Sequence, residues 1–175
     1  MSETSADDRG EPAAAAPGLL IRQLEPADLE EVVALSLRAW APVFASFAEV
    51  LGPRIYPLVY PDWPSSQAAA VRAACAGEHV FVAELGDGPV GFAAVMIRDD
   101  DPKTAELDMI AVDPASQRHG VGHALTTFVE DYMRAAGVVV ADIATGGDRA
   151  HEPARRTYEK AGFTALPLVR YYKAL

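Results

Sequence analysis

Hydrophobic and polar positions along the chain predict helices and strands in turn. Apolar residues in segment 27–40 recur every three or four positions, which predicts a helix with Pro26 at or near its first turn. Segment 65–77 predicts a second helix that begins with a serine cap and ends at a glycine. Segments 121–136 and 151–162 predict two more helices, each closed by a glycine. The helical part of the fold is therefore spread along the whole chain.

Shorter apolar segments between these helices predict a β-sheet. The expected strands are residues 19–24, 79–85, 89–97, 104–112 and 138–144. A glycine turn at 86–88 joins two of them as a hairpin, and the continuous apolar run 138–144 predicts a strand buried on both faces. Residues 163–174 predict one or two further strands, broken at Pro167, whereas residues 41–64 give no clear pattern. The predicted fold class is α/β, of the α+β type, with a central mixed, mostly antiparallel sheet flanked by helices.

Composition narrows the class of protein. A chain of 175 residues predicts one domain, here over residues 19–175, behind an acidic tail over 1–18 that we expect to be disordered. The tail has no export signal, and the apolar runs are too short to predict a membrane span. The single cysteine, Cys75, excludes an internal disulfide and favours a cytoplasmic location. A net charge of −10 argues against nucleic acid as a partner and is compatible with a cationic substrate.

The stretch DPASQRHGVGHAL, residues 113–125, carries the clearest chemical signal. It joins the predicted strand 104–112 to a predicted helix, and it places Gly120 and Gly122 where that helix begins. The N-terminus of a helix offers unpaired N–H groups and a positive dipole, and glycine lets an anion approach the backbone. The pattern predicts a phosphate-binding loop; the alternative is that both glycines only permit a tight turn and close packing.

Other ligand sites fit this stretch less well. A dinucleotide fingerprint requires a third glycine where Leu125 stands, and no nucleotide-triphosphate loop is present. His119 and His123 lie four residues apart, and His151 is a conceivable third zinc ligand. The metalloprotease motif, however, needs a glutamate where Gly120 stands, so we expect no metal.

Residues 117–122, QRHGVG, and residues 154–163, ARRTYEKAGF, form two motifs. They resemble the Q/R-x-x-G-x-G/A motif and the A-x-x-x-Y-E-K-x-G-F helix of the GNAT superfamily of acyl-CoA-dependent N-acyltransferases. Their order, and the strand and helix around the first motif, agree with the family. The resemblance covers residues 19–175 and is weakest over 40–64.

This resemblance implies acetyl-CoA as the acyl donor. Its pyrophosphate is expected on the backbone of the loop, and its pantetheine arm along the preceding strand, where a backbone N–H can polarise the thioester carbonyl. The residues implied in the loop are Gln117, Arg118, His119, Gly120, Val121 and Gly122, and those on the strand are Met109, Ile110, Ala111 and Val112. His151 stands where many family members have an asparagine that helps to bind cofactor or substrate.

The resemblance also implies catalytic residues. Tyr158 matches the family's acid for the departing thiolate, and its alternative role is a core aromatic. Glu106 and Asp108 are two residues apart on a strand, so they share a face and are candidate bases; alternatively they are solvated carboxylates. Asp142, on the strand predicted to be buried, is expected to need a hydrogen-bonding partner.

The acceptor is the least defined part of the prediction. One segment is rich in aromatic residues that either line an acceptor cleft or simply pack together: Trp40, Phe44, Phe47, Tyr56, Tyr60 and Trp63. We expect N-acetylation of a primary amine of a small molecule or peptide, by direct attack in a ternary complex. The alternatives are acetylation of protein lysines or N-termini, and a non-catalytic acyl-CoA-binding module. A homodimer is expected by analogy only.

Overall fold

A computed structural model describes residues 17–86 and 88–175 of the chain. The tail that the sequence predicts to be disordered falls almost wholly on residues 1–16, which lie outside this range, so that prediction is not tested. All statements below concern the described residues.

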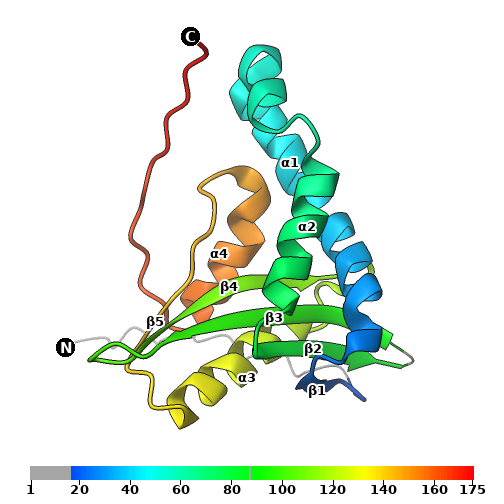
Figure 1. Cartoon of the computed structure of the whole chain (residues 1–175), viewed down its shortest axis with the longest axis vertical. Helices are drawn as coiled ribbons and strands as arrows, with labels where there is room; N and C mark the ends of the chain where they lie inside the picture. Colours follow the sequence, from blue (N-terminus) through cyan, green and yellow to red (C-terminus); the bar gives the residue numbers. More distant parts are fainter. Residues whose placement is uncertain (1–16, 87) are drawn as a thin grey trace, which may run out of the picture.

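The centre of the fold is a five-stranded sheet in the order β1-β2-β3-β4-β5 (Figure 1). Its strands are β1 (Leu20–Gln23), β2 (His79–Leu85), β3 (Gly88–Arg98), β4 (Thr104–Val112) and β5 (Val140–Asp142). The first three neighbouring pairs are antiparallel, and β4 pairs with β5 in parallel. The predicted mixed, mostly antiparallel sheet is confirmed.

Helices cover both faces of this sheet. Figure 1 shows α1 (Leu29–Val59) and α2 (Trp63–Cys75) on one face and α3 (Val121–Ala135) on the other. Helix α4 (Glu152–Lys160) stands on the α1 side, where the short 3₁₀ helix η3 (Arg149–His151) before it contacts α1. Two further 3₁₀ turns, η1 (Pro26–Asp28) and η2 (Pro114–Ser116), lead into α1 and away from β4.

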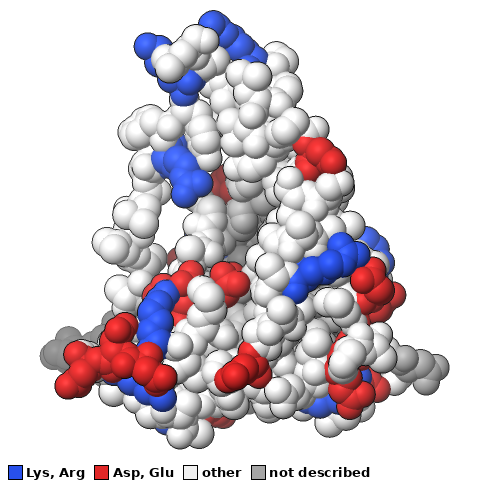
Figure 2. Space-filling view, viewed as in Figure 1, with Lys and Arg blue, Asp and Glu red and all other residues white. Residues whose placement is uncertain are grey.

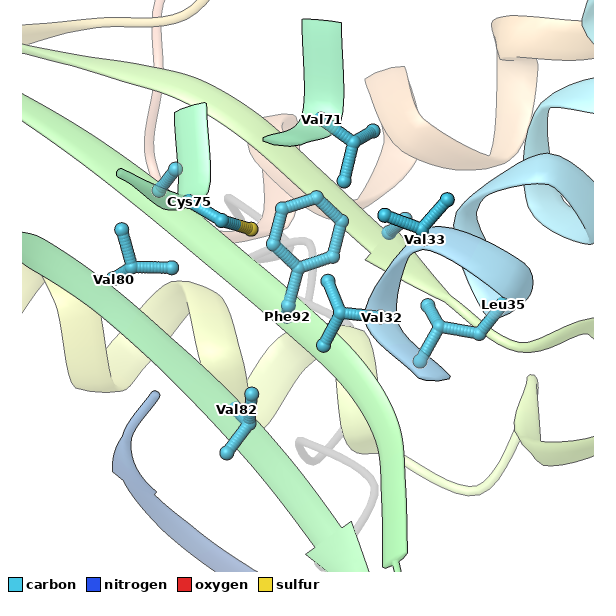
Figure 3. Close-up of a cluster of buried hydrophobic side chains, with 10 residues drawn as sticks. Val32, Val33, Leu35, Val71, Cys75, Val80, Val82 and Phe92 are labelled. Atoms are coloured by element: carbon cyan, nitrogen blue, oxygen red, sulfur yellow. The ribbon is translucent and has the colours of Figure 1, made fainter. Parts of the chain in front are cut away.

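The alternation of side chains along the strands divides the buried residues into two cores. On one face, Phe92 of β3 packs against valines of α1 and α2 (Figure 3). On the other face, Leu107 of β4 packs against Leu125 and Val129 of α3. Successive residues of a strand point to opposite faces, so β4 contributes side chains to both cores. It can still present polar side chains where its outer edge is open.

Most of segment 41–64, which had no clear sequence pattern, is part of helix α1. The helix continues to Val59, and Gly52, at φ 68°, interrupts it and is followed by Pro53 at the start of a second helical stretch. By length and composition, residues 26–59 are apolar enough to cross a membrane, which the short apolar runs of the sequence did not predict. The helix instead buries residues such as Val32 and Leu35 against the sheet, as a core helix does.

Three local predictions were wrong. The first concerns the cap of α2, which is Asp62 and not a serine: its carboxylate accepts a hydrogen bond from the Ser65 N–H at 3.3 Å. The helix consequently starts two residues earlier than predicted.

The second concerns β5, which is three residues long and lies at the edge of the sheet. Its apolar run predicted burial on both faces, but Val139 and Val140 are 66% and 56% exposed. A continuous apolar run predicts a central strand only when helices cover both faces, and this edge strand is not covered in that way.

The third concerns residues 163–175, which form no strand. They leave the end of α4 and run away from the sheet (Figure 1), and Leu166, Leu168 and Tyr171 are more than four-fifths exposed. Apolar, β-branched and aromatic residues favour a strand, but a strand also requires a partner ladder, which this segment does not reach.

Candidate active site

The ladder between β4 and β5 ends early, and this opens the sheet. The two strands pair only from Thr104 to Glu106, whereas β4 continues to Val112. The register with β3 shifts so that Asp108 has no direct partner, which is a β-bulge. Backbone groups of β4 beyond Glu106 therefore face a gap on the β5 side, where an extended ligand can hydrogen-bond as an added strand.

The gap leads directly into the loop 117–122. Arg118 and Gly120 both have left-handed backbone conformations, at φ 65° and 78°. Gly120 caps α3 without any side-chain hydrogen bond, so the first N–H groups of that helix have no side-chain cap. Backbone N–H groups in such a turn, at the positive end of a helix, form a site for an anion.

Other side chains hold this loop in place. Arg38 of α1 donates from Nε to the Asp113 carboxylate at 2.9 Å, and the same carboxylate accepts from the Ala115 N–H. Gln117 donates from Nε2 to the carbonyl of Val112 at 3.1 Å, so this side chain points back to β4. The loop is thereby tied to both α1 and the open edge of the sheet.

The two glycines of the loop differ in what requires them. Gly120 needs its small size because its backbone is left-handed. At Gly122 a Cβ atom would meet only Val112 Cγ2, at 3.7 Å, which is an ordinary contact. The backbone conformation thus explains Gly120, whereas the packing of the protein leaves Gly122 free to accept a side chain.

Tyr158 lies on α4 with a buried ring. It is 9% exposed and contacts the ring of Phe163 edge-on, with centroids 6.1 Å apart. Burial raises the pKa of its hydroxyl to about 12. No hydrogen bond from this hydroxyl is present among the described residues. The hydroxyl is protonated at neutral pH, so it can donate a proton but cannot act as a base.

The two carboxylates predicted as bases have different surroundings. Glu106 forms an ion pair with Arg98, and the same guanidinium reaches Asp142 Oδ1 at 3.0 Å. Asp108, at the bulge, is exposed and forms no ion pair within the described part of the chain. Asp142 has the partner that the sequence predicted, since Arg98 binds it, but its side chain is exposed and not buried as predicted.

His151 is the predicted site residue with the most defined environment. Its Nδ1 lies 2.5 Å from Oδ2 of Asp148, and its ring lies 5.8 Å from that of Phe47 on α1. The structure therefore places His151 at the start of α4, in contact with the aromatic segment of α1. The loop 117–122 lies about thirty residues earlier in the chain.

The aromatic residues of α1 and α2 gather above this point. Phe44 stacks on Trp63 at 4.4 Å, and Phe47 stacks on Tyr60 at 5.6 Å. Figure 2 shows the surface hollowed between α1 and the C-terminal segment, with acidic side chains along the lower border of the hollow. The rings therefore pack on one another, which is one of the two roles that the sequence left open, and lining of an acceptor cleft stays a prediction.

Sequence reasoning missed the residues that hold the site side chains. These are Arg38, Ser46, Arg98 and Asp148. Only Asp148 had a local signal, because an aspartate just before a helical turn is a typical N-cap, and its carboxylate does accept from the Ala150 N–H. Among residues 17–86 and 88–175, no group of His, Cys, Asp and Glu side chains is arranged to hold a metal ion.

Comparison with known proteins decides the family. The family model of the GNAT acetyltransferases matches residues 47–163, which include the open edge of β4, the loop and α4. The chain belongs to the GNAT acetyltransferase family. The resemblance in the two sequence motifs is thus confirmed, as is the fold class.

Relatives and solved structures agree with this assignment. Mycothiol acetyltransferases from Beutenbergia cavernae and Sanguibacter keddieii are 36% and 38% identical to this chain over 92 and 88 residues, or 53% and 48% of its length. The chain covers only 30% and 27% of those two proteins.

Solved structures share the fold over most of the chain. A GNAT-family protein from Desulfovibrio desulfuricans is 27% identical, with a TM-score of 0.61 over 85% of this chain and 87% of that protein. The aminoglycoside N-acetyltransferase AAC(6')-Iy, solved with CoA, is 20% identical, with a TM-score of 0.60 over 89% of this chain and 94% of that one.

Proposed function

We propose that this GNAT protein transfers an acetyl group from acetyl-CoA to a primary amine of a small molecule or peptide. The observation that carries the proposal is the continuous path from the unpaired edge of β4 to the loop 117–122 and the uncapped start of α3. An extended amide-bearing arm suits the first part of this path, and a pyrophosphate suits the second. The two parts of CoA have this chemistry and this order.

In the proposed reaction the amine attacks the thioester directly while both substrates are bound. Backbone N–H groups along Met109–Val112 stabilise the oxyanion of the tetrahedral intermediate. Tyr158 gives its proton to the departing thiolate, a role for which its raised pKa keeps it protonated. Arg118, His119 and Val121 complete the pyrophosphate site with Gly120 and Gly122.

Two observations support a small, cationic or aromatic acceptor. Stacked rings gather on α1 and α2, and the carboxylate of Asp108, at the open edge of β4, is exposed. The relatives and neighbours include enzymes named for mycothiol and for aminoglycosides, and one neighbour was solved with sisomicin. Aromatic faces and a carboxylate both favour an ammonium group.

The test is a screen of acceptors with the purified chain and acetyl-CoA. Polyamines, aminoglycosides, amino-acid derivatives, aromatic amines and lysine peptides are compared by release of free CoA thiol and by the mass of the product. We expect acetylation of at least one small amine. Acetyl-CoA binding without any turnover would favour the non-catalytic module, and turnover with peptides alone would favour protein modification.

A further inference from the structure

A partly buried histidine–aspartate pair lies at the start of α4. His151 Nδ1 and Asp148 Oδ2 are 2.5 Å apart, and their side chains are only 16% and 10% exposed. Gly146 makes room for the pair, because a Cβ atom there would lie 2.4 Å from both Asp148 Oδ2 and His151 Nδ1. The pair is therefore built into the local backbone and is not a chance surface contact.

Further hydrogen bonds fix the aspartate. Arg155 donates to the carbonyls of Gly146 and Asp148, at 2.5 and 2.8 Å, and so closes the turn. Burial alone would raise the pKa of Asp148, but hydrogen bonds from His151, from Ser46 of α1 and from the Ala150 N–H hold it below its usual value. The carboxylate is thus ionised at neutral pH.

The ionised carboxylate determines the state of the imidazole. A carboxylate can only accept hydrogen bonds, so Nδ1 of His151 must carry the hydrogen between them. In the neutral imidazole the lone pair then resides on Nε2. A histidine oriented by an aspartate in this way is ready to take a proton at Nε2.

The position of His151 connects the predicted acceptor region with the predicted acid. It precedes Tyr158 by seven residues, or about two helical turns, so the two lie on one side of α4 about 10 Å apart along the axis. On its other side the ring of His151 approaches Phe47, which stacks on Tyr60. His151 therefore lies beside the aromatic segment and at the start of the helix that carries Tyr158.

We propose that His151 is the general base that deprotonates the acceptor ammonium, with Asp148 as its positioning residue. The proposal rests on the proposed function. Nε2 of His151 takes one ammonium proton, directly or through one water molecule, and later passes it to solvent. The nitrogen lone pair forms the C–N bond, the C–S bond breaks, and the thiolate takes the Tyr158 proton. The second N–H proton of the adduct restores Tyr158 through solvent.

One of the two carboxylates predicted as bases, Glu106, is engaged elsewhere, which favours His151 over Glu106. Glu106 is held by Arg98, which also binds Asp142, so its carboxylate is committed to an ion pair across β4 and β5. His151 has one ring nitrogen committed to Asp148 and the other left for a substrate.

The test measures steady-state kinetics of His151→Gln and Asp148→Asn with amines of graded pKa. For an alkylamine, which is protonated at neutral pH, we expect kcat to fall by about 10²–10⁴-fold in His151→Gln, with the KM for acetyl-CoA nearly unchanged. For an acceptor that is already neutral at this pH, the kcat of the variant should approach that of the wild type. Asp148→Asn should show the same dependence on acceptor pKa, with smaller losses of kcat. Added imidazole should partly restore the kcat of His151→Ala.

A matched control is His79→Gln, which removes a histidine that hydrogen-bonds Tyr132 at 2.8 Å, away from this site. It should leave the dependence on acceptor pKa unchanged. Equal losses for all acceptors, or a raised KM for acetyl-CoA with unchanged kcat, would overturn the base and leave His151 as a structural or cofactor-binding residue. A wild-type chain that acetylates no amine would instead contradict the proposed function itself.

Discussion

Tyr158 is the site residue whose environment most restricts its chemistry. Its ring is packed within the protein, and its hydroxyl has a pKa of about 12 because burial disfavours the anion. A weak acid of this kind does not ionise during the reaction cycle except by giving its proton to a stronger base. A solvated thiolate is a weaker base than the phenolate, so the proposed transfer from Tyr158 requires that the nascent CoA thiolate be poorly solvated.

Removal of that hydroxyl tests its catalytic role. Tyr158→Phe keeps the ring and its contact with Phe163, so the melting temperature and acetyl-CoA affinity should stay near those of the wild type. If Tyr158 protonates the thiolate, kcat should fall by about 10²–10⁴-fold. Steady-state kinetics and a melting curve on one preparation measure both effects. A kcat within about twofold of wild type, with chemistry rate-limiting, would show that solvent supplies the proton.

At the scale of elements, the junction between β4 and α3 is the proposed donor site. Strand β4 has an open edge because β5 pairs with only its first residues, and α3 begins without a side-chain cap. Each feature by itself costs stability, since unpaired backbone groups need a partner or water. Together they leave a line of backbone groups available to one extended anionic ligand.

A bulky side chain at position 122 should weaken acetyl-CoA binding strongly without unfolding the chain. A side chain there meets only Val112 within the protein, at 3.7 Å, so Gly122→Val should fold and lose at least about tenfold in affinity, or about 1.4 kcal/mol. Calorimetric titration measures this. Wild-type affinity in a folded variant would show that the pyrophosphate lies elsewhere.

Gly91→Ala supplies the contrast. Its Cβ would lie 3.0 Å from the carbonyl oxygen of Ala111 and 3.1 Å from Leu125 Cδ1, so this variant should lose about 1–3 kcal/mol of stability. Gly88→Ala, with nothing within 4 Å of its Cβ, should change stability by less than about 0.5 kcal/mol. Urea unfolding of the two variants separates a glycine required for packing from one that is not.

At the scale of the whole molecule, three buried groups limit the pH range of stability. Hydrogen bonds from Arg22, which joins β1 to η1 and β2, lower the pKa of Asp28 against the effect of burial. Burial raises the pKa of the Cys75 thiol to about 11 and that of Tyr158 to about 12. These shifts act at opposite ends of the pH scale.

The free energy of unfolding should therefore fall at both ends. The contribution of Asp28 is present above its unfolded pKa near 3.8 and is lost as pH falls below it, because the unfolded chain takes up the proton first. Those of Cys75 and Tyr158 are present at neutral pH and are lost as pH rises from about 9 towards 12, because the unfolded chain ionises first. Urea titrations across pH measure both limbs. Asp28→Asn should reduce the acid dependence only in part, because the pKa of Asp148 is lowered as well, and should leave the alkaline limb. Unchanged acid sensitivity would contradict the role of Asp28.

The sequence by itself determined most of the elements, their order and the loop that leads into α3. Strand β4 has the predicted bounds Thr104–Val112, and α3 starts at the predicted Val121. These features depend on periodicity and glycine placement within short stretches, which act through local backbone geometry. The cytoplasmic location and the homodimer remain predictions.

Only the tertiary structure decided which side chains meet. Glu106 is tied to Arg98 on a neighbouring strand, and Asp148 is fixed by Ser46 of a distant helix as well as by His151. Tertiary structure also decided that the apolar run of β5 lies at an exposed edge. Such outcomes depend on contacts between segments far apart in the chain, and local periodicity carries no information about which partner a strand edge or a carboxylate finds.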